Sequence, residues 1–236
     1  MMKKAILFDL DGTLLPMDQD IFVKTYFGYL AKKLAPYGYE ASQLIDVIWK
    51  GTAAMVKNTG PKSNEEVFWD YFTSVYGLEK KESDYDKFDE FYRMEFCKAQ
   101  SVCGFQPLAK DVVSFAKSKG YTLVLATNPL FPATAVKQRM RWAGIDSNDF
   151  TLITTYENFH ACKPNPQYFQ EILDKLKLQP EDCVMIGNDT QEDVAAKSIG
   201  IDVFLVTDCL INTKDVDITD IPHGSFEDIR KYIEQL

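Results

Sequence analysis

Short apolar runs alternate with amphipathic segments over most of the chain. The apolar runs predict five buried strands, near 4–9, 121–126, 151–154, 182–186 and 202–206. Helical periodicity between them predicts helices near 108–119, 133–143, 166–177, 190–199 and 225–235. Strands that alternate with helices are typical of a parallel sheet covered on both faces, so we expect an α/β fold.

Residues typical of helix ends lie at several of these boundaries. Gly120, Gly144 and Gly200 fall where helix C-caps are expected, because glycine tolerates the left-handed conformation found there. Ser225 is expected to be the N-cap of the last helix.

The segment 16–105 has a different pattern, with helical periodicity throughout. It predicts helices near 19–35, 41–57, 64–76 and 84–100. Gly60 and Pro61 indicate a break, and Ser63 with Glu66 indicates a capping box. The segment holds 18 of the chain's 31 aromatic residues, enough for a small helical core of its own. We therefore expect two domains, an α/β core of 1–15 with 106–236 and a helical insert of 16–105, joined by hinges near 15–18 and 101–107.

Two carboxylates follow the first predicted strand. Asp9 and Asp11 are two positions apart, so their side chains meet if the extended geometry persists to the turn at Gly12. One interpretation is a divalent metal site with oxygen ligands, and another is an acid and base pair with separated pKa values. By themselves the two residues fit an acidic, solvated turn equally well.

Three later segments place polar groups near the ends of predicted strands. Each group alone has an ordinary explanation as a turn residue, a surface charge or an acid that complements a helix dipole. In an open parallel sheet, however, ligands bind at the carboxyl ends of the strands, so their joint occurrence favours one ligand site. These groups are Thr127 with Asn128, Lys163, and Asp189 with Asp193.

Four motifs in this order resemble those of the haloacid dehalogenase superfamily of phosphohydrolases. The motifs are Asp9–Thr13, Thr127 with Asn128, Lys163 with Pro164, and Gly187–Asp193. The flanking stretches 163–169 and 195–201 also resemble the family. One departure is the stretch 156–160, where relatives often carry a glycine, and it concerns a loop rather than the chemistry.

The resemblance implies both an architecture and a reaction. The core would be a Rossmann-like parallel sheet, and the insert would be a helical cap that covers the active site and selects the substrate. The reaction would be magnesium-dependent hydrolysis of a small phosphate monoester through an aspartyl-phosphate. Asp9 would be the nucleophile, and Asp11 would be the general acid and base.

The other motif residues are implied to bind phosphate or metal. Thr127, Asn128 and Lys163 would hold the phosphate oxygens. The ligands of Mg²⁺ would be oxygen atoms from Asp9, the main-chain carbonyl of Asp11 and Asp189, with Asp193 as a further ligand or as support.

Three alternatives differ from this hypothesis in chemistry or class. A haloacid dehalogenase is expected to lack the second acid of the first motif, so Asp11 argues against it. A phosphomutase shares the motifs and differs in returning the phosphoryl group to its substrate. A phosphate-binding protein without catalytic activity would be favoured by loss of a key acid, and none is lost.

Composition narrows the partners and the location. A hydrophobic fraction of 46% and a charged fraction of 26% are typical of a globular protein. The net charge of −9 disfavours nucleic acid, and no segment resembles a signal peptide or a membrane span. Five cysteines without zinc-type spacing fit reduced thiols, so we expect a cytoplasmic protein. Its partner, as the resemblance implies, would be a small phosphorylated metabolite. The loops 36–42 and 57–62 are candidates for substrate specificity, and the oligomeric state is not indicated.

Overall fold

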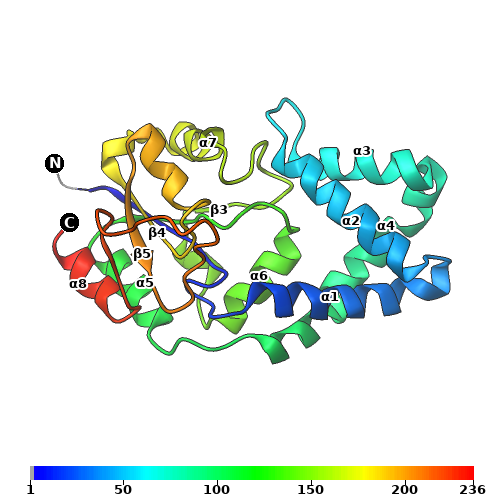
Figure 1. Cartoon of the computed structure of the whole chain (residues 1–236), viewed down its shortest axis with the longest axis horizontal. Coiled ribbons are helices and arrows are strands. Elements are labelled where there is room, and N and C mark those ends of the chain that lie inside the picture. The colour runs from blue at the N-terminus through cyan, green and yellow to red at the C-terminus, as the bar shows by residue number, and fades with distance from the viewer. Residues whose placement is uncertain (1–2) are drawn as a thin grey trace.

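The fold consists of a twisted parallel sheet with helices on both faces and a group of helices to one side (Figure 1). This computed structural model describes residues 3–236, and within them six strands lie in the order β3-β2-β1-β4-β5-β6. All neighbouring pairs are parallel, which confirms the predicted α/β, Rossmann-like fold. The strands are β1 (Ala5–Phe8), β2 (Thr122–Leu125), β3 (Leu152–Ile153), β4 (Cys183–Gly187), β5 (Asp202–Val206) and β6 (His223–Gly224).

Alternation along β1 divides the core into two layers. Ile6 and Phe8 face one apolar cluster, and Ala5 and Leu7 face the other. The first layer contains α5 (Ala109–Ser118), α6 (Ala133–Trp142) and α8 (Asp228–Glu234), and the second contains α7 (Pro166–Leu176) and the 3₁₀ helix η5 (Val194–Ile199). Because both faces are buried, every residue of β1 is apolar, as the sequence predicted.

Three predictions about the core need correction. The expected helix 190–199 is only the 3₁₀ helix η5, because Asp189 and Asp193 accept the N–H groups of the turn before it. Strand β6 was not predicted, since two residues carry no readable periodicity. The last helix begins at Asp228, and Ser225 is not its N-cap: the N–H and hydroxyl of Ser225 both donate to Asp228 Oδ2. The expected C-cap at Gly200, by contrast, is confirmed, with a φ of 93°.

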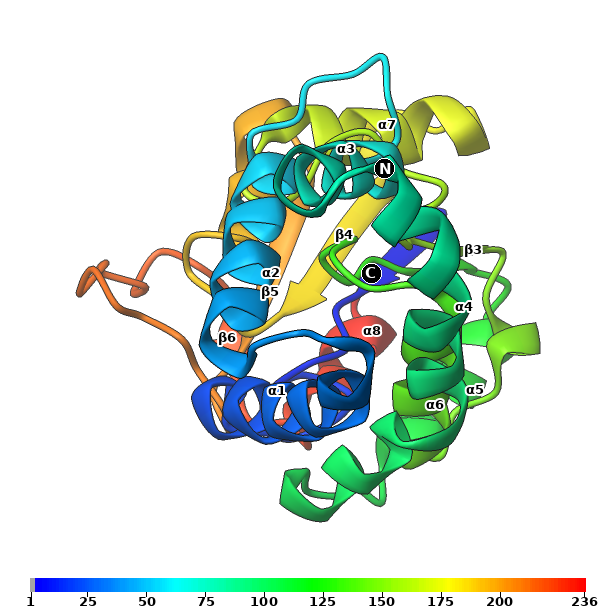
Figure 2. The same ribbon diagram turned by 90° about the vertical axis from the view of Figure 1, so that its right-hand side faces the viewer.

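The insert between β1 and α5 is helical, as predicted. Figure 2, viewed from the side of the insert, shows its four α-helices in front of the sheet, with β4 visible between them. Ser63 and Glu66 form the expected capping box. The predicted helix 84–100 is wrong in its bounds, because its first turns are highly charged and show no apolar period. The elements are α1 (Gln19–Leu34), η1 (Ala35–Tyr37), α2 (Ala41–Val56), α3 (Asn64–Tyr76), α4 (Leu78–Met94) and the 3₁₀ helix η2 (Phe96–Val102).

The two chain crossings into and out of the insert lie side by side. Met17 and Cys103 form an antiparallel bridge, and Gly104 N–H donates to the Pro16 carbonyl at 2.7 Å. The aromatic core of the insert is continuous with the first layer of the sheet, because Phe96 stacks on Trp142 with ring centroids 5.3 Å apart. The predicted domain boundaries stay a prediction, although these crossings fall within the expected hinge segments.

Two further observations concern the whole described chain. Among residues 3–236, no helix has both the length and the apolar character needed to cross a membrane. All five cysteines are free thiols in this structure.

Candidate active site

Loops from four strand ends bring the predicted residues together at one edge of the sheet. The centre of the group is the Lys163 ammonium, which lies 2.9 Å from Asp9 Oδ1 and 2.6 Å from Asp193 Oδ1. Only 1% of the Lys163 residue is exposed. Burial alone lowers the pKa of Lys163, but Asp193 and Asp9 outweigh it and raise that pKa well above its usual value. The lysine is therefore a fixed positive charge between two carboxylates.

Asp193 is hydrogen-bonded through both of its carboxylate oxygens. Its Oδ2 accepts the N–H groups of Asn188 at 2.9 Å and Asp189 at 3.0 Å, while Oδ1 faces Lys163. A Cβ at Gly187 would lie 2.1 Å from Asp193 Oδ2, so only glycine leaves room for this side chain. These contacts tie the loop after β4 to Lys163.

Asp9 is buried in a polar pocket of the first motif. Thr13 Oγ1 lies 3.3 Å from Asp9 Oδ2 and 3.0 Å from Asn188 Oδ1. Gly12 has a φ of 84°, and a Cβ there would lie 2.3 Å from Asn188 Nδ2. Burial raises the pKa of Asp9 to about 7, against the opposing effect of Lys163. Thr13 closes the first motif, and no role was predicted for it from the sequence.

Asp11 has a partner that the sequence analysis missed. Arg139 Nη1 on α6 donates to Asp11 Oδ2, and only 1% of Arg139 is exposed. Among the described residues, Asp11 Oδ1 and two guanidinium nitrogens of Arg139 have no hydrogen-bond partner. A signal for Arg139 was present, because it follows the apolar residues Ala135 and Val136 at helical spacing and so lies on the buried face of α6.

Asn128 joins the second and third motifs. Its Oδ1 accepts the Lys163 N–H at 3.2 Å, and its Nδ2 donates to the Lys163 carbonyl at 3.3 Å. The carbonyl of Thr127 accepts from the Tyr168 hydroxyl at 3.0 Å and from Thr154 Oγ1 at 2.6 Å. Thr127, Asn128 and Lys163 are thus brought to one place, with the amide of Asn128 occupied by the Lys163 main chain.

Acidic residues outnumber the basic ones around Lys163. Asp189 Oδ1 accepts the N–H groups of Gln191 at 2.7 Å and Glu192 at 2.9 Å, which positions the Asp189 carboxylate. Burial raises the pKa of Glu192 to about 8, against the opposing effect of Lys163 and with a contribution from Asp193. Glu192 is therefore a second residue of this site that was not predicted from the sequence. Its position inside the fourth motif was the available signal.

The donors at this edge are of the type that Mg²⁺ accepts. Within residues 3–236, no three His, Cys, Asp or Glu side chains already stand in a metal-binding arrangement. Asp9 and Asp189 nevertheless follow the neighbouring strands β1 and β4, and their carboxylate oxygens, like the main-chain carbonyl of Asp11, are hard donors that suit Mg²⁺. The excess of negative charge near Asp9 also fits a cation.

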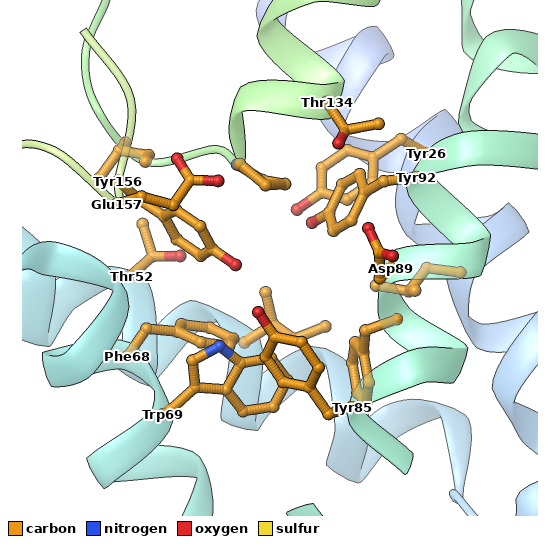
Figure 3. A pocket seen from close by; sticks show the side chains of 15 residues that line it. Tyr26, Thr52, Phe68, Trp69, Tyr85, Asp89, Tyr92, Thr134, Tyr156 and Glu157 are labelled. Carbon is orange, nitrogen blue, oxygen red and sulfur yellow. The ribbon is translucent and has the colours of Figure 1, made fainter.

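A cavity lies between the insert and the loops after β2 and β3 (Figure 3). Its walls come from the four α-helices of the insert and, on the core side, from residues between 130 and 157. The loops 36–42 and 57–62, expected to be specificity elements, do not line this cavity. The difference arises because helix faces that the insert packs together, rather than the loops, enclose the space.

Comparisons with known proteins show the family of the chain. The model of the family described as haloacid dehalogenase-like hydrolase matches residues 6–206. A phosphoglycolate phosphatase of Vibrio vulnificus is 26% identical over 207 residues, covering 86% of this chain and 83% of the relative.

Solved structures show the same fold at lower identity. A structure described as a predicted phosphoglycolate phosphatase from Haemophilus somnus has a TM-score of 0.60 and 21% identity, covering 98% of each chain. A putative β-phosphoglucomutase from Thermotoga maritima has a TM-score of 0.57 and 21% identity, covering 99% of each chain. The family match supports the predicted class of enzyme, and the chain belongs to the haloacid dehalogenase-like hydrolases.

Proposed function

We propose that this hydrolase releases phosphate from a small phosphate monoester, with Mg²⁺ as cofactor and an aspartyl-phosphate on Asp9 as intermediate. The observation that carries the proposal is the buried contact of Lys163 with both Asp9 and Asp193, next to Asp11 held by Arg139. A nucleophile, a proton donor and a fixed positive charge are the groups that such a transfer needs.

In the first half of the reaction, a carboxylate oxygen of Asp9 forms a bond to phosphorus. The bond between phosphorus and the leaving alcohol breaks, and Asp11 gives its proton to that alcohol. Oδ1 is the available atom of Asp11, because Oδ2 already accepts from Arg139. We expect Arg139 to hold the orientation of this carboxyl group while Oδ1 faces the substrate.

In the second half, a water molecule attacks the phosphorus of the intermediate. Asp11 takes a proton from that water, the bond to Asp9 breaks, and inorganic phosphate leaves with Asp9 restored as a carboxylate. Dividing one displacement into two lets the same acid act first as donor and then as acceptor.

Residues from three motifs would bind the phosphoryl group and the cation. We assign the phosphate oxygens to Lys163 and the Thr127 hydroxyl, with the Asn128 side chain positioning the Lys163 main chain. Asp9, the carbonyl of Asp11 and Asp189 would hold Mg²⁺, which when bound offsets the repulsion between carboxylate and phosphate. The hydrogen bonds of Asp193 favour support of Lys163 over direct ligation.

The insert would act as a cap over this edge of the sheet. Asn64, the first residue of α3, donates through Nδ2 to the Pro129 carbonyl at 3.3 Å, close to the second motif. A cap in this position excludes water and contacts the leaving group of the substrate. The predicted cytoplasmic location and small phosphorylated substrate stay predictions of this proposal.

The test is phosphate release from a panel of sugar phosphates, nucleoside monophosphates and small acid phosphates, with and without Mg²⁺. We expect release that stops with chelation and returns with Mg²⁺, whereas the larger Ca²⁺ should not replace it. Analysis of the products separates hydrolysis from a phosphomutase, which would keep the phosphoryl group on the sugar. Full activity after exhaustive chelation would contradict the metal assignment.

A further inference from the structure

The cavity beside the active site has an unusual chemical lining. Of its fifteen lining residues, seven are aromatic, two are carboxylic acids, and none is lysine, arginine or histidine. Figure 3 shows the hydroxyls of Tyr26, Tyr92 and Tyr156 directed into the cavity, with the carboxylates of Asp89 and Glu157 at its edge. The cavity has a volume of about 80 Å³. A cavity that holds one water needs about 10–15 Å³, so a ligand group of a few heavy atoms fits here.

The charges around the cavity are negative on balance. The Tyr85 hydroxyl donates to Glu65 Oε1 at 2.9 Å, and both Glu157 oxygens accept the Ala133 N–H. Burial raises the pKa of Tyr85 to about 12, with further contributions from Glu65, Asp89 and Glu157. Asp89 and Glu157 line the cavity themselves, so their carboxylates contribute negative charge to its wall.

Three cations lie near the cavity without lining it. Arg93 pairs with Asp89 at 2.5 Å but is 60% exposed, so solvent screens that pair. Arg139 is paired with Asp11, and Lys81 lies 5.9 Å from the ring centroid of Trp69. A positive ligand group would meet aromatic faces and carboxylates inside the cavity, where it would share Asp89 with Arg93. The charge of Arg139 also reaches the cavity, because it acts on Tyr26 and Tyr92.

Trp69 provides an independent sign of a ligand. Its exposure is 5%, and among the described residues its indole N–H has no hydrogen-bond partner. Figure 3 shows the ring nitrogen on the side of Trp69 that faces the cavity. A buried donor without a partner is costly, and a ligand with an oxygen acceptor would satisfy it.

The cavity is joined to the active site through the chain segments that build both. Leu130 and Pro132 line the cavity shortly after Asn128 of the second motif. Asn64 Nδ2 lies 3.3 Å from Cys162 Sγ, beside Lys163, and α3 then carries Trp69 into the wall. These segments make the cavity the candidate site for the alcohol of an ester whose phosphate lies at Asp9.

We propose, on the basis of the phosphatase function proposed above, that the substrate is a phosphate monoester whose alcohol carries a small ammonium group, either primary or quaternary. Cations bind over aromatic faces because the ring quadrupole is negative there, and nearby carboxylates strengthen that attraction. A carboxylate in the same position would meet Asp89 and Glu157 with no positive partner in the wall.

The decisive experiment compares esters that differ in charge but not in shape. Choline phosphate has an uncharged carbon isostere, 3,3-dimethylbutyl phosphate, and we expect kcat/KM to favour choline phosphate by about 10–30-fold, the range of a desolvated cation–π contact. Ethanolamine phosphate distinguishes a primary from a quaternary ammonium group. Equal rates for the charged ester and its isostere, or a preference for phosphoglycolate, would overturn the proposal.

Substitutions in the cavity wall test which residues recognise the ammonium group. Asp89→Asn and Trp69→Leu should each reduce the ratio of kcat/KM between choline phosphate and its isostere severalfold, and this ratio is insensitive to partial loss of folded protein. The matched control is Asp86→Asn, at an exposed acid that lies on α4 with Asp89, and this change should leave the ratio unchanged. An unchanged ratio in both wall variants would place recognition of the cation elsewhere.

A binding measurement separates this inference from the proposed chemistry. Choline and 3,3-dimethylbutanol are titrated calorimetrically into the Asp9→Asn protein, which requires no turnover. Preferential binding of choline supports the cavity assignment whether or not the enzyme releases phosphate. If no ester, including 4-nitrophenyl phosphate, releases phosphate, that result refutes the phosphatase proposal alone. Equal or absent binding of the two alcohols would refute the cavity assignment.

Discussion

The carboxyl edge of the sheet and the cavity of the insert are built by opposite means. At the edge, Asp9, Lys163 and Asp193 are buried polar groups joined by short ion pairs and hydrogen bonds. In the cavity, aromatic rings such as Trp69 and Tyr92 form the wall mainly by packing. At the edge, the loss of a single hydrogen bond or ion pair is expected to lower the activity of the enzyme. The shape of the packed wall depends instead on the placement of several helices at once.

This difference explains why short sequence motifs identify the edge but not the cavity. A phosphoryl group demands the same few donors and charges whatever alcohol it is attached to, so the edge is described by short motifs. The alcohol is recognised by surface shape and charge, and such a surface can be composed of residues from any helix that reaches it. Substitutions at the edge and in the insert test this contrast.

The nucleophile should be the least replaceable group at the edge. Asp9→Asn keeps the size of the side chain but removes its negative charge, and we expect phosphate release to fall by about 10⁶-fold, as for loss of a nucleophile in other hydrolases. The measurement is steady-state phosphate release with a thermal unfolding scan to check the fold. Asp86→Asn serves as control, and substantial turnover by the Asp9 variant would rule out a covalent intermediate on that residue.

Arg139 should contribute to catalysis through Asp11. Arg139→Met removes the partner of Asp11 Oδ2, so we expect a loss of about 10²–10⁴-fold for alkyl phosphates, the usual range for proton transfer. The loss should be smaller for 4-nitrophenyl phosphate, whose leaving group needs less protonation. Arg141→Met on the exposed side of the same helix is the control. Equal losses on both esters would show that Arg139 acts only on stability.

Phe96 should join the insert to the sheet. It is fully buried and stacks on Trp142, so Phe96→Ala should destabilise the protein by about 3–5 kcal/mol. For a chain of this size each kcal/mol lowers Tm by about 2–4 °C. Phe105→Ala, at a position that is 64% exposed, should change Tm little. A folded Phe96 variant with unchanged Tm would mean that the insert is stable independently of the sheet.

The smallest effect is expected at the start of α3. Ser63→Ala removes the side chain that accepts the Glu66 N–H, which should cost about 0.5–2 kcal/mol. Because α3 carries Trp69, the same change should weaken selection of the alcohol more than reaction of 4-nitrophenyl phosphate. The control is Ser74→Ala near the other end of α3, where the hydroxyl only donates to the Tyr71 carbonyl. Equal effects of the two substitutions on Tm would argue against a capping contribution.

The sequence by itself determined the layers of the core and the residues of the chemical edge. Apolar runs located five of the strands, because a strand buried on both faces must be apolar throughout. The positions of Asp9, Lys163 and Asp189 followed from motifs at the strand ends, since the connections in a parallel sheet return the chain to the same edge. Local patterns were sufficient wherever the physical cause was itself local, as in the capping box at Ser63.

Only the tertiary structure decided the contacts between distant segments. The pairing of Arg139 with Asp11 joins residues 128 positions apart, and periodicity could show that Arg139 is buried but not what it meets. The cavity likewise combines helices of the insert with the loop that carries Tyr156. A sequence pattern records which face of an element is apolar, whereas the partner of that face is chosen by packing of the whole chain, and that choice defines the wall that would select the substrate.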